Sequence, residues 1–136
     1  MNNQYQKENT VEASSDGKII YVRWQNLSDS QTVRDCCLWQ LNHVKAGALI
    51  IIVDTSTAKG APANDIQEWF GKTLFPDFQA SGLASVITIL SSSTITRMAT
   101  ERWNDVGSPF GFSMFETDSK ESAYKLANEQ ITKSGK

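Results

Sequence analysis

The segment Asp54–Gly60 gathers the side chains of this chain that are best suited to chemistry. It directly follows Ala48–Val53, an unbroken apolar run that predicts a buried strand. Ligands of open α/β sheets bind outside the carboxyl ends of such strands. A loop at that place can bind polar groups or accept a phosphate, which adds about −1.5 to −2 charges. Its candidate residues are one carboxylate, three hydroxyls and one ammonium group: Asp54, Thr55, Ser56, Thr57 and Lys59.

The same loop residues have a second interpretation. Asp, Ser and Thr side chains commonly hydrogen-bond the backbone of their own turn, and here they would then only shape the loop. Aromatic side chains form another candidate site. Trp69, Phe75 and Trp103 are expected either in the core, where aromatic rings bury large areas, or around an apolar pocket between helices and sheet.

The remaining reactive residue types do not form a recognisable site. His43 lies near the C-terminal end of a predicted helix, where the helix dipole stabilises a cation, so a structural or surface role is expected. The adjacent Cys36 and Cys37 are expected to be reduced and to serve as small apolar residues. No zinc-ligand spacing, phosphate-binding glycine loop or nucleophile elbow is present in the sequence. The sequence therefore predicts no metal, no cofactor, no catalytic residue and no enzymatic activity.

Length and charge set further limits. A chain of 136 residues fits one domain, and a net charge of −2 argues against a nucleic-acid-binding protein, which needs a basic face. The longest apolar run, Ala46–Val53, is far shorter than the roughly 20 residues of a transmembrane helix. The polar residues 1–10 show no secretory signal, so we expect a cytoplasmic protein.

The elements that must position the loop can be read from turn residues and apolar periodicity. Strands are predicted near Val11 and at Lys18–Trp24, Ala48–Val53, Ala84–Leu90 and Phe110–Phe115, with a hairpin turn at Ser14–Gly17. Helices are predicted from Ser28 to Gly47, from Pro62 to Gly82 with a bend or break at Pro76, from Ser91 to Gly107, and from Thr117 onward. This order predicts a single α/β domain with a mixed, mostly parallel sheet of about five strands and about four helices. The domain spans residues 10–131, between a flexible N-terminus at 1–9 and a flexible tail at 132–136.

Several of these segments resemble the SpoIIAA-like branch of the STAS superfamily. The resemblance rests on the strand Ile20–Trp24, the strand ending at Val53-Asp54, the helix containing Gln67–Trp69, and the closing pair Phe112–Phe115 and Asp118–Leu126. It covers roughly Thr10 to Glu129 and implies the STAS/SpoIIAA-like fold.

The resemblance also implies two kinds of function. Better-known members are anti-sigma-factor antagonists, switched by phosphorylation of a serine in an Asp-Ser-Ser-Gly-type loop. That loop is similar to Asp54–Thr57, with Ser56 at the acceptor position, although Thr57 stands where glycine would be. Related SpoIIAA-like and SEC14-like domains hold small apolar or lipid-like molecules, and the Trp69 helix with its Pro76 interruption is similar to that branch.

The sequence thus leads to a main expectation and one alternative. The main expectation is a non-enzymatic regulatory domain that holds a small apolar or amphipathic ligand between helices and sheet. The alternative is a protein–protein switch of the anti-sigma-factor-antagonist kind, with a phosphorylatable loop and a regulatory protein partner. An exposed edge strand is compatible with a monomer or a weak homodimer.

Overall fold

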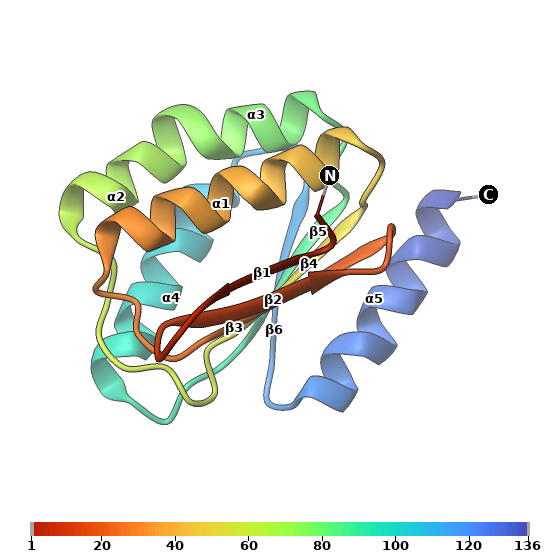
Figure 1. Ribbon diagram of the computed structural model, residues 1–136. Coiled ribbons are helices and arrows are strands. Elements are labelled where there is room, and N and C mark those ends of the chain that lie inside the picture. Colours follow the sequence, from red (N-terminus) through yellow and green to blue (C-terminus); the bar gives the residue numbers. More distant parts are fainter. Residues whose placement is uncertain (1, 136) are drawn as a thin grey trace.

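A six-stranded sheet runs through the computed structural model, which describes residues 2–135 and the side chains of residues 2–133 (Figure 1). The strands lie in sequence order and are β1 Gln4–Lys7, β2 Val11–Ser15, β3 Ile19–Trp24, β4 Ile50–Asp54, β5 Ser85–Ile89 and β6 Ser113–Thr117. The pairs β1–β2 and β2–β3 are antiparallel, and the three pairs from β3 to β6 are parallel. This confirms a single mixed α/β sheet, with one strand more than predicted.

The two halves of the sheet differ in how their faces are covered. In the parallel half, β5 is buried along its whole length, as expected for a strand with helices on both faces. In the antiparallel half, β2 alternates, with Val11 and Ala13 buried and Glu12 and Ser14 exposed. One face of β2 therefore meets the core and the other meets solvent. The predicted hairpin turn is confirmed, with Gly17 at a φ of +95°, a conformation that favours glycine.

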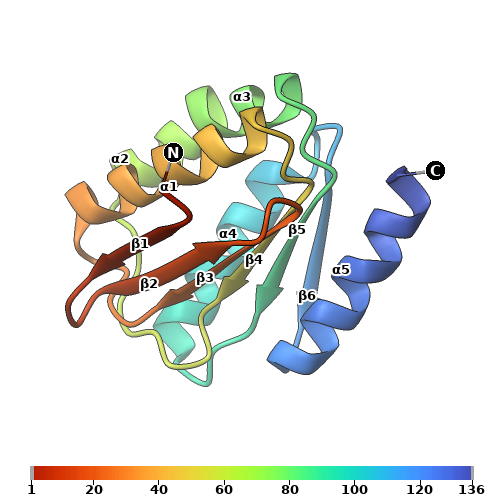
Figure 2. The ribbon, with the colours of Figure 1, turned by 45° about the vertical axis from the view of Figure 1, so that its right-hand side comes forward.

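Helices cover the sheet unequally. On one face lie α1 Ser30–Lys45, the continuous rod formed by α2 Asn64–Trp69, η1 Phe70–Leu74 and α3 Phe75–Ala80, and α4 Thr94–Gly107. The last helix, α5 Lys120–Gly135, lies alone on the other face (Figure 2). Helix α1 begins where predicted, because the carboxylate of Asp29 caps it by accepting a hydrogen bond from the Thr32 amide at 3.2 Å.

Pro76 does not break the second helical segment. The rod instead changes to a π-helical turn at Phe70–Leu74, immediately before the first turn of α3 that contains Pro76. Proline has no N–H and its ring crowds the preceding turn, so a widened turn at this place relieves both problems. The rod keeps its apolar side on the core through Ile66, Phe70, Leu74, Phe75 and Phe78.

Three predicted boundaries need correction. Gln4–Lys7 form the edge strand β1, so this part of the segment 1–9 belongs to the sheet. The last strand is Ser113–Thr117 instead of Phe110–Phe115, because Phe110 and Phe112 join an aromatic cluster around Phe75, with ring centroids 6.1 Å and 5.7 Å from it. The last helix continues to Gly135, through most of the predicted tail. Residues 1 and 136 of those predicted ends lie outside the described residues.

Candidate functional site

The loop after β4 begins with two anchoring residues. Thr55 is fully buried, and both its amide and its hydroxyl donate to the carbonyl of Ile89 at the end of β5, at 3.0 Å and 2.6 Å. Asp54 is only 5% exposed, and its carboxylate accepts hydrogen bonds from the Tyr21 hydroxyl on β3 and from the Ser56 amide, the latter at 2.9 Å. These two residues therefore fix the start of the loop to both neighbouring strands.

The Tyr21–Asp54 contact also changes the acidity of the phenol. Burial raises the pKa of Tyr21 well above its usual value, and the hydrogen bond to the Asp54 carboxylate raises it further. Tyr21 therefore keeps its proton through the neutral range and remains a donor to Asp54. The contacts of Asp54 and Thr55 are thus those of residues that shape the loop, as in the second interpretation of the sequence.

The second half of the loop is held from two other elements. The amide of Lys59 donates to the carbonyl of Gln25, and the amide of Leu27 donates to the carbonyl of Lys59, both at 3.0 Å. On the helix side, the hydroxyl of Thr96 donates to the carbonyl of Gly60 at 2.8 Å. The backbone from 54 to 60 is consequently fixed both where it leaves β4 and at Lys59 and Gly60.

Ser56 and Thr57 form the tip of this fixed loop. Both are exposed, and neither hydroxyl has a hydrogen-bond partner among residues 2–133. The Lys59 side chain is also exposed close by. The structure therefore separates the five predicted loop residues into two buried anchors, Asp54 and Thr55, and three accessible side chains.

Exposed apolar side chains stand beside the loop at the start of α4. Ile95 and Met98 are each 64% exposed, and Thr96 between them ties this helix to the loop carbonyl of Gly60. Large apolar side chains this exposed, next to an accessible loop, suit a contact surface. Sequence reasoning did not single them out. Their spacing gave no signal, since Ile95, Met98, Ala99 and Trp103 stand at i, i+3, i+4 and i+8, the pattern of a single buried helix face.

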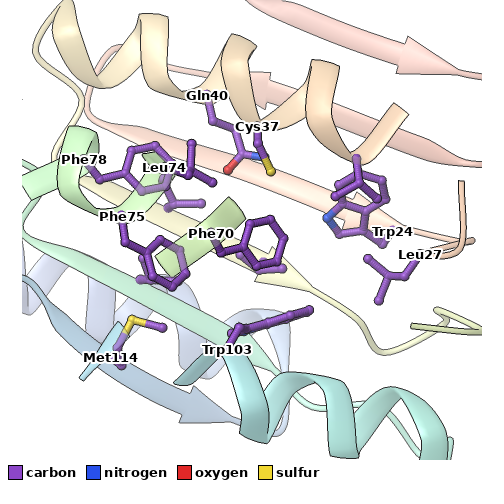
Figure 3. Close-up of a pocket in the computed structure, with 14 residues that line it drawn as sticks. Trp24, Leu27, Cys37, Gln40, Phe70, Leu74, Phe75, Phe78, Trp103 and Met114 are labelled. Atoms are coloured by element: carbon purple, nitrogen blue, oxygen red, sulfur yellow. The ribbon is translucent and has the colours of Figure 1, made fainter. Parts of the chain in front are cut away.

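The predicted aromatic residues lie in two different places. Phe75 and Trp103 are buried and line an internal cavity of about 50 Å³ between the helices and the sheet, together with Trp24, Phe70, Leu74 and Phe78 (Figure 3). Trp69 does not line it; its half-buried ring packs under the guanidinium of Arg34, at 5.1 Å. Pockets for small molecules measure about 300–1,000 Å³, so this cavity has no room for a lipid-like ligand in the state described.

The remaining candidates lie away from the loop. Cys36 and Cys37 are both free and buried, and burial raises the pKa of the Cys36 thiol to about 12. His43 is buried, with Nε2 2.8 Å from the carbonyl oxygen of Asn2. Among the described residues no cluster of three or more His, Cys, Asp or Glu could hold a metal ion. Nor is any helix in that part of the chain long and apolar enough to cross a membrane.

Comparison with known proteins supports the fold alone. No protein-family model matches the chain, and no curated protein matches it. Among solved structures, it is similar to the anti-sigma factor antagonist SpoIIAA in its unphosphorylated form, with a TM-score of 0.63 and 14% sequence identity. The similarity covers 88% of this chain and 97% of SpoIIAA. The six-stranded sheet with its four helical segments is therefore a SpoIIAA-like, STAS-type fold.

Proposed function

We propose that this chain is a cytoplasmic, non-enzymatic regulatory domain that binds a protein partner at the 54–60 loop and is switched by modification of Ser56. The observation that carries the proposal is the tip of the loop, where an exposed, unpartnered Ser56 hydroxyl stands on a backbone fixed by Asp54 and Thr55. The fold supports it, since the similar protein SpoIIAA is described as an anti-sigma factor antagonist with an unphosphorylated form. The two free cysteines support a reducing compartment.

The local charges explain how a phosphate would act as a switch. It would add about two negative charges beside the Asp54 carboxylate, which is buried directly beneath the Ser56 amide. Because the loop backbone is held at both ends, the chain cannot easily move to disperse this charge. The phosphate would therefore stay at the tip, where it would repel an acidic partner surface and would have to lose its hydration to contact an apolar one. The exposed Ile95 and Met98 beside the loop supply an apolar contact area for the unmodified state.

The test is a comparison of partner capture by three forms of the domain. Native protein, Ser56→Asp and Ser56→Ala are immobilised and exposed to lysate of the native host, and bound proteins are quantified by mass spectrometry. We expect one protein retained by the native and Ser56→Ala forms and bound at least about tenfold less by Ser56→Asp, a difference of about 1.4 kcal/mol.

Ser108→Asp serves as the matched control. Ser108 is also exposed, but it follows the opposite end of α4 from the loop, so the same added charge there should leave capture unchanged. Equal capture by the Ser56→Asp and native forms, or an equal loss with Ser108→Asp, would contradict the proposal.

A further inference from the structure

The face of the sheet that α5 covers has an open half. Helix α5 packs on β4, β5 and β6 (Figure 2). Ala123 and Ala127 of this helix are buried against the isoleucines of the two central strands. Over β1, β2 and β3 the same face holds a groove of about 550 Å³. That volume lies within the range of small-molecule sites. The groove is separate from the apolar cavity, which lies on the opposite face of the sheet.

The floor of the groove is made of polar side chains in ordered rows. Strand register places them across the sheet as one row of Gln6, Glu12 and Arg23, and a second row of Gln4, Ser14 and Tyr21. Rows of polar residues are usual on the solvated face of an antiparallel sheet, and the particular feature here is the hollow that these side chains share with Lys120 of α5. Here amide, hydroxyl and charged groups from three strands point into one hollow, where they can act on one molecule together.

Two cations flank the Tyr21 ring in this groove. Arg23 is two residues from Tyr21 on the same strand, so both side chains leave the same face. Lys120, from the first turn of α5, places its ammonium 4.4 Å from the Tyr21 ring centroid. The ion pairs among the described residues are Lys7–Asp29 and Arg34–Asp65, so neither groove cation forms an ion pair there. Glu12 and Asp54 stand on either side of Arg23 in the strand register.

We propose that this groove binds a small polar metabolite with an anionic group at one end and hydrogen-bond donors at the other. The anionic group lies between Arg23 and Lys120, because a guanidinium presents paired donors that match a phosphate or carboxylate. The Glu12 carboxylate, directly opposite Arg23 in the register, accepts a hydroxyl or ammonium of the same molecule. Gln4 and Gln6 on β1 add amide groups at the outer side.

The experiment is an NMR titration of the full chain with glycerol 3-phosphate, and separately with inorganic phosphate. We expect saturable shifts of the backbone amides of β1–β3 and Lys120, with glycerol 3-phosphate binding at least threefold tighter than phosphate. Arg23→Gln and Lys120→Gln should each weaken binding at least fivefold. Glu12→Gln should remove the preference for glycerol 3-phosphate. Circular dichroism verifies that each variant is folded.

Arg97→Gln is the matched control, since Arg97 is an exposed cation on α4, across the sheet from the groove. It should change neither affinity by more than twofold. Shifts that grow linearly without saturation, an equal loss in Arg97→Gln, or unchanged binding in Arg23→Gln would overturn the proposal. This test uses no protein partner, so its failure leaves the proposed switch at Ser56 unaffected.

Discussion

Replacing Tyr21 with phenylalanine removes a single oxygen atom and, with it, the hydrogen bond from β3 to the Asp54 carboxylate. The ring keeps its packing against Tyr124, with centroids 5.9 Å apart, so the change isolates the hydrogen bond. Asp54 is 5% exposed, and water therefore has little access to replace the lost donor. The carboxylate keeps the amide of Ser56 as a donor, at 2.9 Å.

The expected loss follows from the charge of the acceptor. Hydrogen bonds to charged groups contribute about 1.5–3 kcal/mol, so we expect Tyr21→Phe to lower the free energy of unfolding by about 2 kcal/mol. With a denaturant slope near 2 kcal/mol per molar urea, the unfolding midpoint should fall by about 1 M. Urea titration followed by tryptophan fluorescence and circular dichroism measures this shift.

Tyr124→Phe is the control for this prediction. Tyr124 lies on α5 against the same face of the sheet, and its hydroxyl has no hydrogen-bond partner among the described residues. Its loss should cost less than about 0.5 kcal/mol. Equal urea midpoints for the two variants would refute the reasoning. The Tyr21–Asp54 hydrogen bond would then add no more to the free energy of unfolding than a phenol hydroxyl exposed to solvent.

The same bond predicts a dependence on alkaline pH. Burial and then the hydrogen bond to Asp54 raise the pKa of Tyr21 above its usual 10. Below about pH 10 the phenol is protonated in both the folded and the unfolded chain, so its stabilising contribution is fully present. Above pH 10 the unfolded chain releases the proton first, and stability falls. The difference in stability between native protein and Tyr21→Phe should therefore narrow above pH 10, and a constant difference up to pH 11.5 would contradict the assignment.

Two further predictions concern other parts of the chain. The hydrogen bond from Lys7, followed by those from Thr32, holds the pKa of Asp29 at about 2, so the stabilisation it gives is present above about pH 4 and is lost as pH falls toward 2. Asp29→Asn keeps a side chain that can cap the helix, but the free energy of unfolding should then fall less steeply below about pH 4 than in the native protein. Equal slopes for the native protein and the variant in this pH range would exclude the stabilising role of the Asp29 carboxylate. Burial raises the pKa of Cys36 to about 12 and that of Cys37 well above its usual value, so neither thiol should react with Ellman's reagent at pH 8 in the folded protein. Two thiols should react in 8 M urea, and rapid labelling of either one without denaturant would show that the helix α1 face is open.

The central elements of the fold could be predicted because each carries a local signal. An Asp-Gly turn indicates the hairpin, and unbroken Ile-Val runs indicate the strands buried on both faces. Strand β1 was not predicted, since Gln-Tyr-Gln-Lys has no apolar alternation. It pairs with the adjacent strand β2, and contacts with α1 hold it in place, as Lys7 binds Asp29 at 2.7 Å and the ring of Tyr5 lies 6.1 Å from that of Trp39. No local pattern encodes either contact.

The candidate site was predictable in place but not in geometry. The loop at Asp54–Lys59 could be located from its position after a buried strand. Which of its side chains would be buried depends on Tyr21 and Ile89, two residues on neighbouring strands whose register the sequence does not state. The groove was missed for a different reason. The groove follows from polar residues at 12 and 14 that alternate with buried residues at 11 and 13. This alternation is visible in the sequence, but it fits an ordinary strand with one solvated face equally well.

Asp54 connects the two proposed sites. Its carboxylate accepts one hydrogen bond from the Ser56 amide at the loop and another from Tyr21 at the floor of the groove. A molecule bound between Arg23 and Lys120 would lie against the Tyr21 ring and alter the orientation of its hydroxyl. Because the carboxylate is buried and has no solvent to compensate, a change in one of its bonds alters the strength of the other. A ligand bound as proposed on the open face of the sheet would thus act on the loop at which we propose that a partner binds.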